Sequence, residues 1–135
     1  GVRKGNMKRG VKAIINKYVK GKGISIIKFE VYLRDNRTED SPIVEKDGYL
    51  IDGRLSSSEV KSLNEELESK GFKGFKALGV MHKDEDWSAP GLLYDRPISV
   101  NYLGLLVIPT DGLTFKKDKY GCITNLDIED YSYNE

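Results

Sequence analysis

The sequence predicts an α+β fold, in which a mainly antiparallel sheet of about five to six strands carries two helices on one face. Two segments, residues 7–20 and 57–70, repeat their apolar residues with the period of a helix. Most other segments alternate apolar and polar residues, as half-buried strands do. The strands follow one another through short connections and do not alternate regularly with helices, which argues against a doubly wound fold. At 135 residues, the chain fits one domain with an ample core.

The first predicted helix is basic and N-terminal. Asn6 can cap its start, and Gly21 and Gly23 follow its end. Gly10 lies inside it and costs about 1 kcal/mol relative to alanine. The apolar residues form a single stripe, spaced as on one helix face: Met7, Val11, Ile14, Ile15 and Tyr18.

The next two segments predict β structure. Residues 24–33 predict a strand, because the odd-numbered residues from Ile27 to Leu33 are apolar and those between them are mostly polar. A polar loop follows. Residues 43–51 then predict a hairpin, with Asp47 and Gly48 in its turn, since Asp-Gly pairs readily adopt positive φ angles.

The second predicted helix, near the middle of the chain, has the clearest boundary signals. Ser56 and Glu59 have the spacing of a capping box, in which each side chain accepts a hydrogen bond from the other residue's amide. Leu55 and Val60 occupy the two positions of a hydrophobic staple around this cap. Gly71 is placed to end the helix.

The second half of the chain predicts a run of strands. Residues 72–81 form one strand, and residues 98–108, the most hydrophobic segment, form a central one. Between them, residues 82–97 predict a long loop. Residues 113–116 and 120–124 predict a closing hairpin.

The charges divide the chain into a basic front and an acidic body. Nine of the 22 Lys and Arg residues lie within residues 1–28, which hold no Asp or Glu. The rest of the chain therefore contains thirteen basic residues and all 21 acidic ones. The net charge of +1 hides this asymmetry. We expect a basic amphipathic arm (1–23), an α+β core domain (24–124) and an acidic, tyrosine-containing tail (125–135).

The basic front is the main candidate binding surface. Three interpretations stay open. The helix packs its stripe on the sheet and its cations are solvated, or it lies along the phosphates of RNA or DNA, or it lies on acidic lipid headgroups with its stripe inserted. The six cations expected to meet an anionic partner are Lys8, Arg9, Lys12, Lys17, Lys20 and Lys22.

The acidic loop at residues 82–86 is the densest group of metal-ligand residue types, with His82 and Glu85 beside two aspartates. Asp84 and Asp86 point the same way in an extended loop, so they are weak candidates to share a hard cation. A solvated charge run explains the same residues, and the loop lacks the spacing of an EF-hand.

The same loop supplies a candidate protein-interaction surface, consisting of Trp87 with Tyr94 and Arg96, because exposed aromatic residues anchor interfaces. Cys122, the only cysteine, has apolar neighbours in a predicted strand and is expected to be a core residue. No residue is assigned a catalytic role, and no metal or other cofactor is expected.

We therefore expect a non-enzymatic binding or structural protein whose basic helix engages RNA, DNA or acidic lipid headgroups. Self-association into a homo-oligomer and a role as a viral or mobile-element accessory protein are further expectations. The alternatives are a protein–protein interaction module that uses the acidic body and the Trp87 loop, and a metal-dependent enzyme that uses residues 82–86. A charged front end and the lack of a long apolar run favour an intracellular protein, cytoplasmic or membrane-peripheral and not secreted.

Overall fold

The computed structural model describes residues 4–83, 88–93 and 102–134 and confirms the α+β fold. Within these residues it contains two helices and six strands. In chain order they are α1 (Lys4–Val19), β1 (Ser25–Asp35), β2 (Ile43–Asp52), α2 (Ser57–Ser69), β3 (Phe75–Lys83), β4 (Ser88–Leu93), β5 (Tyr102–Pro109) and β6 (Leu126–Asn134).

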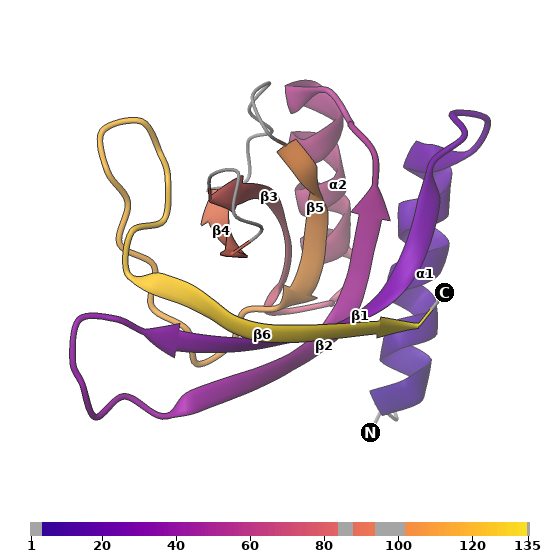
Figure 1. Ribbon diagram of the computed structural model, residues 1–135. Coiled ribbons are helices and arrows are strands. Elements are labelled where there is room, and N and C mark those ends of the chain that lie inside the picture. Colours follow the sequence, from indigo (N-terminus) through magenta and orange to yellow (C-terminus); the bar gives the residue numbers. More distant parts are fainter. Residues whose placement is uncertain (1–3, 84–87, 94–101, 135) are drawn as a thin grey trace.

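The strands form one antiparallel sheet in the order β4-β3-β5-β2-β1-β6. The most hydrophobic segment, β5, lies inside the sheet as the sequence predicts. The sheet is strongly curled (Figure 1), and its edge strands β4 and β6 approach each other. An isolated bridge between Leu93 and Cys122 joins the end of β4 to the segment ahead of β6.

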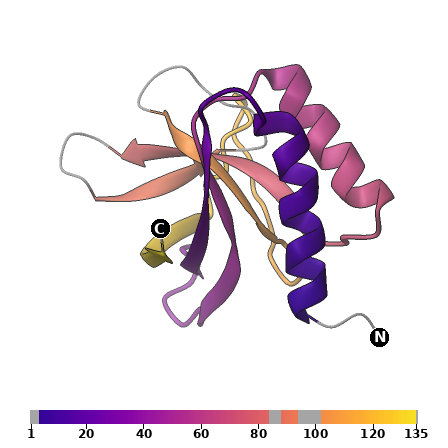
Figure 2. The same cartoon turned by 90° about the vertical axis from the view of Figure 1, so that its right-hand side faces the viewer.

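Each face of the sheet has its own core. Both helices lie side by side on one face, here called the outer face (Figure 2). Their apolar stripes pack on β2, β3 and β5, and burial of each large aliphatic side chain contributes roughly 1.5–3 kcal/mol. The buried residues of this outer core are Val11, Ile14, Ile15, Val19, Tyr49, Ile51, Leu55, Val60, Leu63, Leu67, Ala77, Leu105 and Val107. The inner face curls around a second core: Phe29, Val31, Leu33, Leu50, Leu78, Val80, Leu92, Leu106, Ile108, Ile123, Leu126 and Ile128.

The boundaries of α2 follow the local signals in the sequence. Ser56 Oγ accepts a hydrogen bond from the Glu59 amide at 3.1 Å, and Glu59 Oε1 accepts one from the Ser56 amide at 2.9 Å. Gly71, with φ of +85°, turns the chain after the helix. The Phe72 amide then donates to the Leu67 carbonyl, which closes the last turn.

The hairpin predicted around Asp47 and Gly48 is wrong. β2 continues through both residues and pairs along its whole length with β1. A Cβ atom at Gly48 would collide with the carbonyl oxygen of Val107 in the neighbouring strand β5. The glycine therefore permits close approach of a neighbouring strand and does not form a turn.

Two other segments differ from the expectation. Residues 88–93, predicted to be loop, form β4. The closing hairpin predicted at residues 113–124 is reduced to an isolated bridge between Lys117 and Ile123 and a few backbone hydrogen bonds. Within the described residues, no helix is both long enough and apolar enough to cross a membrane.

β6 contains most of the residues that were expected to form an acidic tail. It pairs antiparallel with β1, from Lys28 opposite Asn134 to Asp35 opposite Leu126. The apolar side chains of Leu126 and Ile128 lie in the inner core, which explains why this charged segment joins the sheet.

A buried polar side chain, Asn125, fixes the segment just before β6. It is only 2% exposed. Its Oδ1 accepts from the Lys116 amide at 2.8 Å, and its Nδ2 donates to the Thr114 carbonyl at 2.8 Å and to Asp35 Oδ2 at 3.3 Å. The Arg37 guanidinium also donates to Asp35, and hydrogen bonds from Arg37 and Asn125 hold the pKa of that carboxyl well below its usual range.

Candidate functional site

The predicted basic surface lies along α1 and the turn that follows it. Its predicted cations are Lys8, Arg9, Lys12, Lys17, Lys20 and Lys22. The side chains of Lys12 and Lys20 are exposed and form no ion pair with any described residue. Val11 and Ile15, on the apolar stripe, are fully buried in the outer core. This part of the stripe is therefore packed within the fold.

Two of the predicted cations hold α1 against α2. The Lys17 ammonium pairs with the Glu66 carboxylate, which also accepts a hydrogen bond from the Tyr18 hydroxyl at 2.9 Å. The bonds from Lys17 and Tyr18 lower the pKa of Glu66. The Lys22 ammonium likewise pairs with Glu59 and lowers the pKa of that carboxyl. These two lysines are engaged within the fold.

An acidic face, which the sequence alone did not reveal, lies on the outer face across β2, β1 and β6, beyond the strands on which the helices pack. Strand alternation places it on the same side of β1 and β2 as the outer core. Four of its six residues are carboxylates. They form two rows across β2, β1 and β6: Asp47, Glu30 and Ser132, then Glu45, Tyr32 and Asp130.

The centre of this acidic face is a cluster of three carboxylates. One carboxylate oxygen from each of Glu30, Glu45 and Asp47 lies within 4.8 Å of the other two. Glu30 Oε2 also accepts hydrogen bonds from the Tyr32 hydroxyl at 3.3 Å and the Ser132 hydroxyl at 3.4 Å. Carboxylate oxygens are the ligands that hard divalent cations take, although exposed acids also gather without a bound ion.

Three carboxylates of the acidic face, those of Glu30, Glu45 and Asp130, are not paired with a cation of the described residues. The charge of Glu45 raises the pKa of Tyr32, and burial and Glu30 raise it further. Like charges on neighbouring strands destabilise a sheet, so this arrangement costs stability in the isolated protein.

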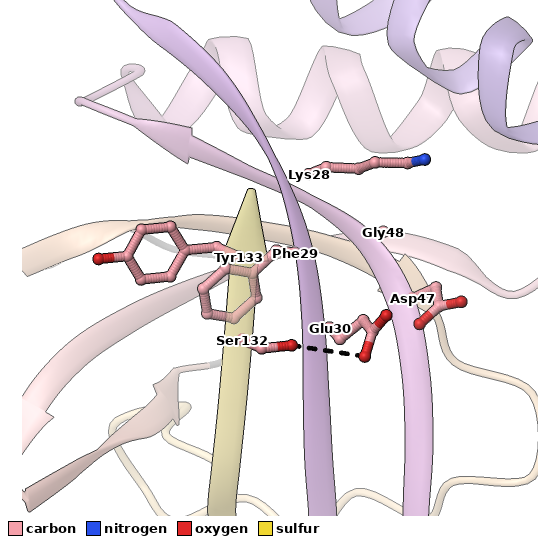
Figure 3. Close-up of a pocket in the computed structure, with 7 residues that line it drawn as sticks. All are labelled: Lys28, Phe29, Glu30, Asp47, Gly48, Ser132 and Tyr133. Atoms are coloured by element: carbon pink, nitrogen blue, oxygen red, sulfur yellow. Dashed lines mark hydrogen bonds between the residues drawn. The ribbon is translucent and has the colours of Figure 1, made fainter. Parts of the chain in front are cut away.

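A hollow of about 170 Å³ opens beside the acidic face. In Figure 3 the Ser132 hydroxyl points across to Glu30 on the neighbouring strand, and the rings of Phe29 and Tyr133 lie to one side of these polar groups. The hollow is lined by Lys28, Phe29, Glu30, Asp47, Gly48, Ser132 and Tyr133. The carboxylates at this hollow belong to the outer face, whereas the rings of Phe29 and Tyr133 belong to the inner face of the same strands.

The inner side of β6 carries two exposed aromatic residues. Tyr131 is 38% exposed and Tyr133 is 54% exposed. Both rings stack with Phe29 of β1, at centroid distances of 5.4 Å and 6.4 Å. Stacking of this kind contributes about 0.5–1.5 kcal/mol beyond area burial. It holds a rigid aromatic surface at the edge of the sheet.

Several predicted site residues lie outside the residues that the structure describes: Asp84, Glu85, Asp86, Trp87, Tyr94 and Arg96. Cys122 is half-buried, and burial raises the pKa of its thiol, with a further contribution from Asp118. The thiolate, which is the reactive form of cysteine, is therefore disfavoured at this position.

Part of the signal for the acidic face is present in the sequence. Glu30 and Tyr32 occupy alternate positions of a predicted strand, and a continuous strand through Glu45 and Asp47 would give the same alternation. The predicted turn at Asp47 and Gly48 interrupts this alternation, so the predicted elements do not place Glu45 and Asp47 on one face of a strand. The pairing register, which brings the carboxylates together, cannot be obtained from one sequence.

Comparison of the chain with protein-family models, with curated proteins and with solved structures found no match.

Proposed function

We propose that this protein is a non-enzymatic binding module that recognises a basic protein partner through its acidic face. The observation that carries the proposal is the cluster of Glu30, Glu45 and Asp47, whose carboxylate oxygens lie within 4.8 Å of one another. A cationic side chain placed there would relieve the repulsion between these groups. The cost of the cluster in the free protein would then be recovered on binding.

The extent of the acidic face favours a protein partner over a single small cation. Its carboxylates span three strands, from Asp47 on β2 to Asp130 on β6, with Tyr32 between them. Tyrosine is enriched at protein interfaces, where its ring contributes area and its hydroxyl a hydrogen bond. A spread negative surface also accelerates encounter with a basic partner at low salt.

Isothermal titration calorimetry with poly-L-lysine, which measures the binding affinity, tests the proposal. The double variant Glu30→Gln/Glu45→Gln removes two carboxylates from the acidic face, and Glu65→Gln/Glu68→Gln removes two exposed carboxylates from α2. We expect the first variant to bind about tenfold more weakly, which corresponds to about 1.4 kcal/mol, and the second to change binding less than about twofold. Equal losses in both variants would refute the acidic face as the binding surface.

A second candidate function is binding of a nucleic-acid backbone by α1. The exposed side chains of Lys12 and Lys20 favour it, because neither is engaged in an ion pair within the described part of the chain. Retention on heparin across a salt series tests it, with Lys12→Gln/Lys20→Gln compared against Lys61→Gln/Lys70→Gln, which changes one lysine on α2 and one at its C-cap. Salt-sensitive retention that only the first variant loses would support this function.

A further inference from the structure

We infer that the basic partner binds as an extended strand added along the outer edge of β6, with basic residues alternating with apolar ones. This inference rests on the proposed function and specifies the form of the partner. It combines three features of β6: its position at the edge of the sheet, the acids on one of its faces and the exposed tyrosines on the other.

Among the described residues, β6 pairs through main-chain hydrogen bonds with β1 alone, and β4 approaches it without pairing. An edge strand presents main-chain donors and acceptors that an incoming strand can pair with. One such donor, the Tyr131 amide, bonds to the Asp130 carboxylate next to it at 2.8 Å. A main-chain carbonyl of the partner could accept the hydrogen bond from that amide in place of Asp130. The Asp130 carboxylate would then be available to pair with a cation of the partner.

The two faces of β6 require two different kinds of side chain from the added strand. Alternate residues of a strand point to opposite faces, and neighbouring strands place side chains about 4.5–5.5 Å apart. On the outer face the added strand would lie beside Asp130 and Ser132, and Glu30 on β1 would be two strand spacings, or about 10 Å, away. A lysine or arginine side chain fits there, because it can pair with Asp130 and extend across Ser132 towards Glu30. On the inner face it would lie beside Tyr131 and Tyr133, where an apolar side chain fits.

Charge argues against a second copy of this chain as the added strand. Pairing of β6 with β6 of another copy would bring Glu129 and Asp130 of both copies into the same short ribbon. Acids on an edge strand are a common means of preventing such edge-to-edge pairing. An extended basic peptide is attracted by the same residues.

Two peptides of identical composition test the inference by fluorescence anisotropy. Both peptides are about eight residues long. In the first, single lysines alternate with single valines; in the second, two lysines alternate with two valines. Only the alternating peptide can place all its lysines on one face of a strand. We expect it to bind about tenfold more tightly at near-physiological salt. Equal affinity would overturn strand addition; if Glu30→Gln/Glu45→Gln still weakened both peptides, the proposed function would stand.

Backbone methylation gives a readout that charge alone cannot produce. The amide nitrogens of every second residue are methylated, in two isomers of the alternating peptide. In an added strand only one set of amides faces β6, so one isomer should lose binding and the other should retain it. Equal effects of the two isomers would contradict strand addition.

The tyrosines provide a matched pair of variants. Tyr131→Ala/Tyr133→Ala should reduce the preference for the alternating peptide over the paired one. Tyr120→Ala removes a tyrosine that is 73% exposed but lies outside β6, and it should leave the preference unchanged. If the double variant kept the full preference, the tyrosines would have no part in binding.

Discussion

Gly48 in β2 lies directly against the main chain of Val107 in β5, with no room between them for a side chain. Gly48→Ala should therefore destabilise the protein, by about 1–3 kcal/mol or more, because the neighbour that must move is backbone. Urea unfolding measures the change. Gly91→Ala is the control, since a Cβ atom there meets no atom of the described residues within 4 Å. Equal stability of the two variants would show that β2 and β5 can separate at Gly48.

The capping box at the start of α2 contributes to stability. Ser56→Ala removes the acceptor for the Glu59 amide and should lower the free energy of unfolding by about 1 kcal/mol. Ser62→Ala, at an exposed position inside the same helix, should leave stability unchanged or slightly raised, because alanine is the better helix former. A loss of stability in Ser62→Ala as large as that in Ser56→Ala would remove the special role of the cap.

Asn125 joins three segments through one buried amide. Asn125→Ala leaves the Lys116 amide and the Thr114 carbonyl without this partner, and a cost of about 1–3 kcal/mol is expected. Asn36→Ala, which removes two exposed hydrogen bonds to Thr124 and Asp127, should cost less. Thermal and urea unfolding of both variants check the order of the two effects.

Asp35 should make stability depend on acidic pH. Its pKa in the folded state lies below the ordinary value of 3.8, because Arg37 and Asn125 donate hydrogen bonds to the carboxylate. The folded state therefore binds this proton less readily than the unfolded state. The stabilisation is fully present above about pH 5 and is lost as the pH falls through 3.8 and below.

The Asp35→Asn variant lacks this titration. The difference in unfolding free energy between the wild-type protein and the variant should stay constant near neutral pH and narrow below about pH 4. Urea unfolding at a series of pH values measures it. A difference that stays constant down to pH 3 would mean that the interactions of Asp35 with its donors do not contribute to stability.

Glu45 should show opposite effects on stability and on binding. Glu45→Gln relieves repulsion among the clustered carboxylates, so the urea midpoint of the free protein should rise. The same variant should bind poly-L-lysine more weakly. Such a trade-off is expected where a surface is shaped for a partner. If the variant lowered the urea midpoint, the cluster would be structural and not a binding surface.

Local signals allowed some elements to be predicted from the sequence. The capping box at Ser56 and Glu59 and the stop at Gly71 depend on neighbouring residues, so α2 was predicted almost to its ends. The apolar stripe of α1 was recognised for the same reason. Gly10 is a partial exception: it weakens the helix locally, but the Phe72 ring lies against it and leaves no space for a side chain.

The features that escaped prediction depend on residues far apart in the chain. A glycine is needed at position 48 because β5 passes close to it. β6 joins the sheet because its apolar residues pack in the inner core. The acidic face requires the register of β2, β1 and β6, which places Glu45 beside Tyr32 and Tyr32 beside Asp130. The basic helix was recognised correctly as a helix, but Lys17 and Lys22 were assigned to a partner and are engaged with α2.

The central claim is that a basic partner binds the acidic face. Its most direct test is a titration of the ¹⁵N-labelled protein with the alternating lysine–valine peptide, followed by ¹H–¹⁵N chemical shifts. We predict that the shifted amides concentrate in residues 28–32, 45–48 and 129–134, along β1, β2 and β6. Shifts concentrated in α1 and α2, with the amides of these three strands unchanged, would contradict it.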